Sequence, residues 1–549
     1  YVVTDIVRNT LGPKVSPLIE EAIELLEEEE YERAAEKIES VFELRVLDPA
    51  CGSGTFLLDA FEYVIVEIDR YNSAAEDAKE EIWGRVTEDN GGFGDVMEEE
   101  LPTVFQDAAE RVIVEMLRGV DLDSQAVSLA KLSLWTRLLR HKPGKYGAEN
   151  GGTKRLPALQ LNVRHGNSLV SSENVPDSQG REAVQLVRRA RNQEIDEAER
   201  IDAAEQFEDL CRDVSEPLDR QILPVFATAE QVVQGLEEVT EDAEQAQTIL
   251  EDTDADELRR LLVNTTGGDD EQIGENGSVT SSEMRETLHV ECTVLDGIEW
   301  RKPFHWEIEF PDVFNPDVAP EDRGFDAVIG NPPYYSIDAR FGKGAPELRW
   351  FKFAFPRSYT DKTDVLFYFL ECGTELLRHE GVLSYIVSRA FMQADKGDGI
   401  REFLAEETEI QRILDFLGNR VFDAGIATAI IQLANEEWET EHTFNACSVL
   451  DLEAVKEYLM EGEAFAQLAE DEIRCVEVDQ NDLEEEPWAF GPYEQIFDTI
   501  DSNGEPLGDI EGVRIGQGIQ TGKNSVFIGD FRDSFPRARI YPRISNSNI

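Results

Sequence analysis

Cysteine and histidine are scarce in this chain, with six of each among 549 residues. The histidines do not cluster, and the cysteines lack the spacing of a metal site or a disulfide framework. The sequence therefore predicts no bound metal, no disulfide and a reducing, cytoplasmic environment. The cysteines are Cys51, Cys211, Cys292, Cys372, Cys447 and Cys475.

Long apolar runs are missing as well. No run reaches the length that crosses a membrane, and no signal peptide opens the chain. We therefore expect no membrane association. Apolar residues still make up 41% of the sequence, so a chain of 549 residues can bury more than one core.

Basic side chains are few: 51 Lys and Arg stand against 115 Asp and Glu, a formal charge of −64. A DNA-binding protein normally carries a basic surface. Either this protein does not bind DNA, or it works where salt screens its charge, since the Debye length is only about 3 Å at 1 M salt. The acid is spread along nearly the whole chain and Arg outnumbers Lys. This pattern is typical of a salt-in halophile such as a haloarchaeon.

A glycine-containing loop follows the first strand-like run. Residues 46–56 read Val-Leu-Asp-Pro-Ala-Cys-Gly-Ser-Gly-Thr-Phe, followed by an amphipathic helical pattern. Gly52 and Gly54 let the backbone turn tightly and approach a ligand closely. The loop is neither the dinucleotide G-x-G-x-x-G nor a P-loop. The pattern predicts a strand–loop–helix unit that binds a different ligand.

Two further strand-like runs continue this pattern. The first ends at Asp121, an acid that can hold ribose hydroxyls or, alternatively, cap the next helix. The second spans residues 159–163 and leads to Asn167, whose role is either ligand binding or local structure.

Residues 330–335, Gly-Asn-Pro-Pro-Tyr-Tyr, follow the apolar run 325–329. The Asn331 amide oxygen is an acceptor, and Pro332 and Pro333 hold an extended backbone whose carbonyls are further acceptors. Tyr334 supplies an aromatic face. Such a loop suits a planar substrate that carries an amino group. A plain surface turn is the alternative for this loop taken alone.

In these motifs the chain resembles the large gamma-class DNA adenine-N6 methyltransferases of Type IIG restriction–modification and phage-exclusion systems, the Eco57I-like methylase family. Residues 48–56 match its cofactor loop, and residues 331–334 match its catalytic Asn-Pro-Pro-Tyr. Residues 303–311, Pro-Phe-His-Trp-Glu-Ile-Glu-Phe-Pro, match a segment that smaller methyltransferases lack. The order of cofactor loop before catalytic loop is that of the gamma class.

The resemblance implies methyl transfer from S-adenosyl-L-methionine to N6 of an adenine flipped out of double-stranded DNA. It implies that Asn331, Pro332, Pro333 and Tyr334 are catalytic, and that Tyr334 stacks on the base. Phe422 matches a second stacking aromatic, with a core phenylalanine as the alternative. Asp364 orients the loop or cofactor, or else caps a helix. The residues implied to bind the cofactor are Asp48, Ala50, Gly52, Gly54, Phe56, Asp121, Asn167 and Asn331.

We expect an α/β fold with a Rossmann-like methyltransferase sheet flanked by helices. The catalytic domain is predicted to span residues 1–440, interrupted by an acidic helical insertion at 171–290. Residues 441–510 are an acidic connecting region, and 511–549 resemble the start of a truncated target recognition domain. The chain opens on a motif that lacks its usual Thr-Pro, which favours a fragment. A nuclease domain on an upstream part, or defence-system partner subunits, are therefore possible additions.

Other functions remain open. Methyltransferases acting on protein glutamine or on RNA share the Asn-Pro-Pro-Tyr chemistry, although segment 303–311 favours the DNA enzymes. A non-catalytic DNA-binding specificity subunit would have no chemical need for both loops. No convincing nuclease triad is present in residues 1–549.

Overall fold

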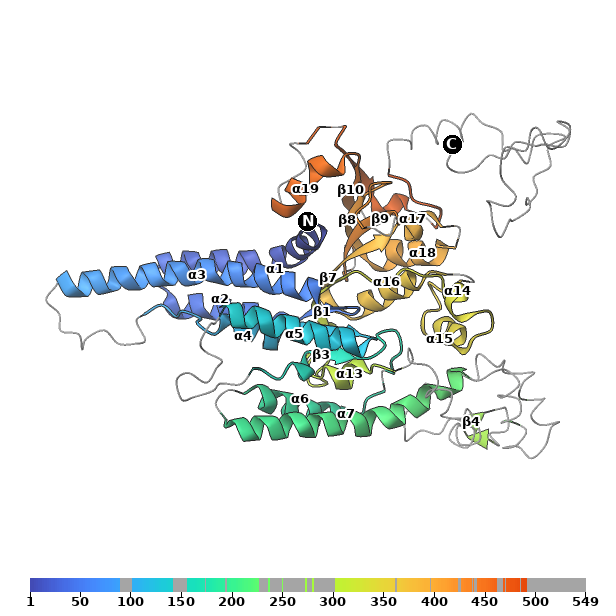
Figure 1. Cartoon of the computed structure of the whole chain (residues 1–549), viewed down its shortest axis with the longest axis horizontal. Helices are drawn as coiled ribbons and strands as arrows, with labels where there is room; N and C mark the ends of the chain where they lie inside the picture. Colours follow the sequence, from blue (N-terminus) through green and yellow to red (C-terminus); the bar gives the residue numbers. More distant parts are fainter. Residues whose placement is uncertain are drawn as a thin grey trace. The chain divides into compact units, whose positions relative to one another are not determined.

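One mixed sheet organises the part of the chain that the structure, a computed structural model, describes (Figure 1). That part comprises residues 1–88, 101–141, 156–172, 174–192, 195–226 and 302–490, plus 236, 249, 272–273 and 279–280. Within 302–490, the residues left out are 361–362, 395, 423–425, 437, 439–441, 462–467, 470 and 484. The chain divides into two compact units, 1–491 and 492–549, and every described residue belongs to the first. The predicted recognition-domain start at 511–549 lies outside the described residues.

The sheet has the strand order β11-β10-β8-β9-β7-β6-β1-β2-β3. From β3 to β7 all strands are parallel, whereas β9 runs antiparallel between β7 and β8. This is the predicted Rossmann-like α/β architecture. The strands are β1 (Val46–Asp48), β2 (Leu117–Asp121), β3 (Val163–His165), β6 (Phe325–Gly330), β7 (Leu377–Ser388), β8 (Glu409–Asp415), β9 (Thr428–Ala434), β10 (Thr443–Val449) and β11 (Ile473–Asp479); β4 (Gln272–Ile273) and β5 (Val279–Thr280) form a separate pair.

Alternate residues of the central strands enter two different cores. Val46 and Ala327 belong to the core under helices α1, α2, α3 and α5, whereas Leu47 and Val328 belong to the core under α15, α16 and α18. Because both faces are covered, β6 is buried at every position, as parallel strands require. The helices are α1 (Val2–Glu27), α2 (Tyr31–Glu43), α3 (Thr55–Glu88), α4 (Ala108–Arg111), α5 (Ser124–His141), α6 (Asp177–Arg191), α7 (Glu197–Phe226), α13 (Trp306–Glu309), α14 (Ile337–Phe341), α15 (Pro346–Ala354), α16 (Val365–Glu375), α17 (Ala390–Gln393), α18 (Asp398–Glu407) and α19 (Leu452–Glu461).

Short helical turns interrupt the connections between these elements. The predicted third strand is wrong in its first half, because Leu159–Leu161 forms a 3-10 turn and the strand begins at Val163. Asn162 explains the break: its Nδ2 donates to the carbonyl oxygens of Val114 (2.8 Å) and Leu117 (2.9 Å). The turn at Leu159–Leu161 is η4, and the other short helical turns are η2 (Val112–Met116), η6 (Pro320–Asp322) and η8 (Gln480–Asp482).

The far end of the sheet continues past residue 440, where the sequence placed a domain boundary. Strands β10 and β11 belong to the same sheet as β1. Their antiparallel register sets Cys447 opposite Cys475, and the two form a disulfide. The expectation of no disulfide is therefore wrong for this pair, because strand register rather than sequence spacing brings the two residues together.

Within the predicted 171–290 insertion, the described part consists mainly of α6 and α7, which pack against each other along one side of the molecule (Figure 1). Their buried face includes Ala183, Val187 and Phe207 and contacts Ile308 of α13. Nothing in the described residues forms a helix long and apolar enough to cross a membrane.

Candidate active site

The two predicted loops lie side by side at the carboxyl ends of adjacent strands. Strand β1 pairs with β2 on one side and with β6 on the other, so strand order reverses between β1 and β6. Ligands bind at such a reversal in open α/β sheets. A methyl group on Gly330 would lie 2.9 Å from Oδ1 of Asp48 and 3.6 Å from the Tyr385 ring. The predicted catalytic loop therefore begins in contact with Asp48, the residue that opens the predicted cofactor loop.

Glycine is needed twice in the loop after β1. Gly52 and Gly54 have φ values of +51° and +85°, in the left-handed region. A side chain on Gly54 would lie 3.1 Å from Cβ of Ala130 on α5, so this glycine also permits close packing. A side chain on Gly52 would meet nothing within 4 Å, so a ligand can approach the backbone there. Phe56, by contrast, is buried in the core beneath the loop.

Asp121 joins the cofactor loop to the end of β2. Its Oδ2 accepts from the Gly52 amide and its Oδ1 from the Asp123 amide, both at 2.8 Å. Asp123 stands directly before α5 and accepts from the Gln125 amide (2.8 Å), so Asp123 rather than Asp121 caps this helix. The Asp121 carboxylate is partly exposed beside the loop, where a ribose could reach it.

Asp48 is a buried carboxyl at the centre of this arrangement. It is 1% exposed, and its Oδ1 accepts from the Ala50 amide (3.1 Å). Burial raises the pKa of Asp48 to about 8, and the charge of Asp121 acts in the same direction. The group is therefore mostly protonated at neutral pH in the ligand-free protein.

The loop after β3 is tied to the cofactor loop and to segment 303–311. Asn167 is buried, and its side-chain Oδ1 accepts from the Leu169 backbone N–H (3.1 Å), while the backbone N–H of Asn167 donates to the Lys302 carbonyl oxygen (2.7 Å). Ser168 Oγ donates to the Pro49 carbonyl oxygen (2.6 Å), a link that the sequence does not reveal. Only the Asn-Ser pair after a strand could have suggested it.

Segment 303–311 serves as packing around this loop. Phe304 is fully buried, and a methyl group on Gly166 would lie 2.6 Å from its ring. His305 Nδ1 accepts from the Ser172 amide (3.0 Å), which leaves Nε2 to donate to Asp219 of α7 (3.0 Å). The family-specific segment thus links the helical pair α6–α7 to the loop beside the site.

The Asn-Pro-Pro-Tyr loop is held by its tyrosine. The Tyr334 hydroxyl lies within hydrogen-bonding distance of Asn331 Oδ1 and of the Ile386 carbonyl oxygen (2.7 Å) on β7. Its single proton can serve only one of these acceptors at a time. Burial, together with the charge of Asp364, raises the pKa of Tyr334, so the hydroxyl stays protonated. The Asn331 side chain is exposed, and its Oδ1 faces the Tyr334 hydroxyl, which can donate either to it or to the Ile386 carbonyl oxygen.

The residues after the loop fix its direction. Ser336 and Asp364 form an antiparallel bridge, and the Val365 amide donates to the Tyr335 carbonyl oxygen (3.0 Å). Asp364 caps α16 by accepting from the Leu366 amide (3.1 Å). The capping alternative for Asp364 is thus observed, and it anchors the catalytic loop as well.

Phe422 lies on the loop between β8 and β9. Thr428, where β9 begins, pairs with Ser388 at the carboxyl end of β7, so this loop meets the same edge of the sheet as Asn331. Phe422 is 38% exposed and is not a core residue. Its contact with a flipped base stays a prediction, and residues 423–425 lie outside the described part.

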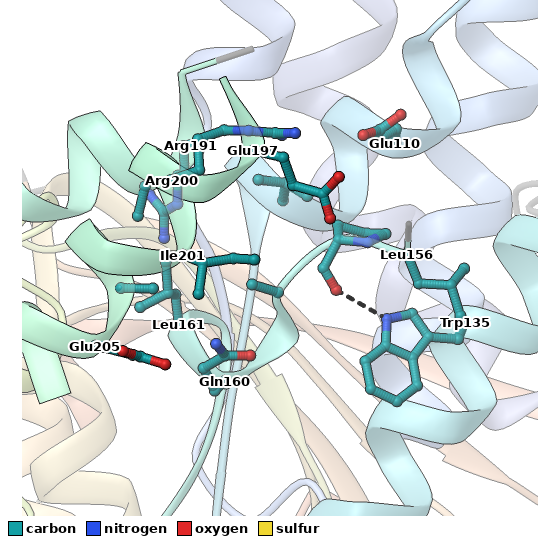
Figure 2. A pocket seen from close by; sticks show the side chains of 15 residues that line it. Glu110, Trp135, Leu156, Gln160, Leu161, Arg191, Glu197, Arg200, Ile201 and Glu205 are labelled. Atoms are coloured by element: carbon teal, nitrogen blue, oxygen red, sulfur yellow. Dashed lines mark hydrogen bonds between the residues drawn. The ribbon is translucent and has the colours of Figure 1, made fainter. Parts of the chain in front are cut away.

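A separate cavity of about 330 Å³ lies between α5 and the α6–α7 pair (Figure 2). Its lining comes from the segments that lead into β2 and β3, such as Glu110 and Leu156, and from side chains of α5, α6 and α7, and it contains none of the predicted site residues. Trp135 closes one side and donates from Nε1 to the Pro157 carbonyl oxygen (3.0 Å). The described residues contain no cluster of His, Cys, Asp or Glu that could hold a metal ion.

Two protein-family models match the chain. The model described as "Eco57I restriction-modification methylase" covers residues 115–422, which is more than half of the chain. The model described as "MmeI, DNA-methyltransferase domain" covers residues 26–182.

Curated relatives are more distant and longer. A Methanocaldococcus jannaschii protein provisionally named as a type II restriction enzyme and methyltransferase (RM.MjaORFECS2P) is 27% identical over 371 residues, 66% of this chain and 27% of that protein. The type II restriction enzyme and methyltransferase RM.Eco57I of Escherichia coli is 25% identical over 205 residues, 37% of this chain and 19% of that protein. The chain thus spans about a quarter and about a fifth of the length of these two relatives. Among solved structures, a DrdV–DNA complex aligns over 87% of this chain and 30% of its own, with 13% identity and a TM-score of 0.38.

Proposed function

Since the chain belongs to the Eco57I restriction-modification methylase family, we propose that it transfers a methyl group from S-adenosyl-L-methionine to N6 of adenine in double-stranded DNA. The observation that carries this proposal is the contact between the two loops where strand order reverses: Gly330 lies against Asp48, so a cofactor bound by one loop faces a base held by the other. A site for an aliphatic amine would not need the flat, aromatic Asn-Pro-Pro-Tyr surface.

The cofactor-binding residues fit S-adenosyl-L-methionine. The open backbone at Gly52 and the carboxylate of Asp121 suit the amino-acid and ribose parts, with Asp48, Ala50, Gly54 and Asn167 forming the surrounding loops. Phe56 supports the loop from the core. The sulfonium supplies an activated methyl group, so positioning accounts for much of the rate.

The chain's own residues prepare the adenine. The lone pair of its amino group is delocalised into the ring, and two acceptors on its N–H bonds concentrate that lone pair on nitrogen. Asn331 Oδ1 and the Pro332 carbonyl oxygen are the proposed acceptors. When the Tyr334 hydroxyl turns to the Ile386 carbonyl, Asn331 Oδ1 becomes free for the amine. The base must flip out of the duplex to reach this loop, and Tyr334 and Phe422 are proposed to stack on it.

The test is to incubate the protein with DNA and labelled S-adenosyl-L-methionine in multimolar KCl and to measure transfer of the label to DNA. We expect labelled N6-methyladenine from the wild-type protein. Asn331→Ala should reduce transfer by about 10²–10³-fold, because it removes one of two acceptors from a transition state that needs both. Cofactor affinity, measured by calorimetry, should change little and shows that the variant is folded. Full activity in Asn331→Ala would refute the assigned role.

The fate of the label also separates the rival functions. Label found on protein glutamine or on RNA would show that the substrate is protein or RNA rather than DNA. No transfer at all would favour a non-catalytic specificity subunit. The names of the curated relatives combine restriction with methylation. A Pro-Asp…Glu-x-Lys nuclease signature in the full-length gene would assign restriction to the same protein, whereas its absence would favour a methylase that works with partner subunits.

A further inference from the structure

The strong acidity of the chain is interrupted next to the catalytic loop. Residues 331–400 contain nine Lys and Arg and nine Asp and Glu, whereas the whole chain has a formal charge of −64. Within this stretch, residues 336–357 hold five basic and only two acidic side chains. A local loss of negative charge in such a chain favours a site for a negatively charged partner.

Two of these cations lie at the end of α14 and on the exposed loop that follows it: Arg340 is in the last turn of α14, and Lys343 is on the loop before α15. Helices α14 and α15 pack beside each other (Figure 1). Residues 340–344 read Arg-Phe-Gly-Lys-Gly. Gly342 and Gly344 have φ values of +86° and +78°, and side chains there would meet nothing within 4 Å. The glycines thus present Lys343 on an exposed loop.

Arg340 and Lys343 form no ion pair with any described residue. The Arg340 guanidinium lies instead over the Tyr335 ring, 4.7 Å from the ring centroid. Tyr335 is the residue that follows Tyr334 of the Asn-Pro-Pro-Tyr loop. By contrast, Arg357 pairs with Glu371, Glu375 and Glu407.

The charges closest to the loop leave it positive. Arg349 is used internally, where it donates to carbonyl oxygens of Phe226 and Gly344. Asp338 is the acid nearest to Arg340 along α14, and Asp364 is occupied as a helix cap. Of the two acids in residues 336–357, Glu347 is buried and Asp338 is partly exposed, whereas Arg340 and Lys343 are both exposed to a ligand.

We propose that Arg340 and Lys343 bind phosphates of the DNA backbone next to the flipped adenine. This inference rests on the proposed function, because it takes DNA as the partner of the adjacent catalytic loop. The exposed loop suits a backbone contact, since glycines on both sides of Lys343 allow close approach to a phosphate. Such contacts fix the position of the duplex and carry no sequence information.

The test compares Arg340→Gln, Lys343→Gln and the double variant with wild-type protein. Arg140→Gln is the matched control: Arg140 is also exposed and forms no ion pair with a described residue, but it lies at the far end of α5, towards the opposite edge of the sheet. DNA binding is measured with two duplexes of unrelated sequence, across a range of KCl concentrations in which circular dichroism shows every variant to be folded. Cofactor binding and the KM for DNA are measured in parallel.

Each neutralised phosphate contributes about −0.9 to the slope of log affinity against log salt. We expect each single variant to flatten the slope by about 0.9 and to lower the affinity for both duplexes by the same factor. The KM for DNA should rise, and the affinity for the cofactor should not change. Arg140→Gln should behave as wild type.

Unchanged slopes in the double variant, with a wild-type protein that methylates DNA, would overturn this inference and leave the proposed function standing. A loss of affinity for only one of the two duplexes would also overturn this inference, because it would indicate that these residues contact bases rather than phosphates. A wild-type protein that neither binds nor methylates DNA would refute both.

Discussion

At the residue scale, the site combines a polar loop with a carboxyl that has lost most of its contact with water. Asp48 is held between Gly330 and the turn at Ala50, and its pKa is raised to about 8 by burial. A group whose pKa is higher in the folded than in the unfolded protein stabilises the fold while it is protonated in both states. That contribution is complete below about pH 3.8 and is lost as the pH rises to about 8.

Asp48→Asn should remove this pH dependence. The amide keeps an oxygen for the Ala50 N–H and cannot ionise, so the ligand-free variant should lose less stability than wild type as the pH rises from 4 to 8. The difference can reach about 1.4 kcal/mol per pH unit. Denaturant unfolding at a series of pH values in constant KCl measures it. If the unfolding free energies of the two proteins changed in parallel with pH, Asp48 would be ionised throughout this range. The contributions of the 114 other acidic residues cancel in the comparison.

The residues that we propose to carry chemistry could be identified in the sequence because chemistry restricts residue type. The glycines of the cofactor loop and the Asn-Pro-Pro-Tyr loop were found as expected, at the ends of β1 and β6. The hydroxyl of Tyr334 between Asn331 and Ile386 was not predictable, because it depends on where β7 lies. The same holds for Ser168, which reaches a carbonyl more than a hundred residues earlier in the chain.

At the element scale, glycine marks the place where the β3 loop meets segment 303–311. A methyl group on Gly166 would lie 2.6 Å from the Phe304 ring, well inside contact distance. Gly166→Ala should therefore cost about 1–3 kcal/mol of unfolding free energy and weaken cofactor binding. Gly418→Ala is the control, since a side chain there would meet nothing within 4 Å.

A double-mutant cycle would show that this cost arises at the contact itself. Phe304→Ala removes the Cδ2 and Cγ atoms that the new methyl group would approach to 2.6 and 3.2 Å, so the Gly166→Ala/Phe304→Ala variant should be more stable than the sum of the single effects by about 1 kcal/mol. Chemical denaturation of the four proteins gives the coupling. Strict additivity would place the strain elsewhere.

Element positions were predicted best where apolar runs were continuous. Strands β6, β7, β8 and β9 lie within or next to the expected runs. The run at 159–163 was partly wrong, because the side chain of Asn162 bonds backbone carbonyls and bends the chain before β3. The Cys447–Cys475 bond was missed because register decides which residues of an antiparallel pair face each other.

At the scale of the whole molecule, the charge of −64 should make folding dependent on salt. Repulsion between like charges opposes the compact state, and screening shortens its range from about 10 Å at 0.1 M salt to about 3 Å at 1 M. We expect the protein to unfold in dilute buffer and to regain cooperative unfolding in molar KCl. Circular dichroism across a KCl series measures this, with sucrose at matched osmolality as the uncharged control. A fully folded protein without added salt would contradict the halophile interpretation.

The position of β6 in the sheet has a consequence for the newborn protein. β1 must leave one edge unpaired until β6 is made, because its partner on that side begins at Phe325. Ribosomes add about 5–20 residues per second, so on the order of 15–60 s separates the emergence of the two loops. During that interval a growing chain can expose a cofactor loop that has no catalytic loop beside it. Under the proposed function, an interrupted translation product would bind the cofactor but would not methylate DNA.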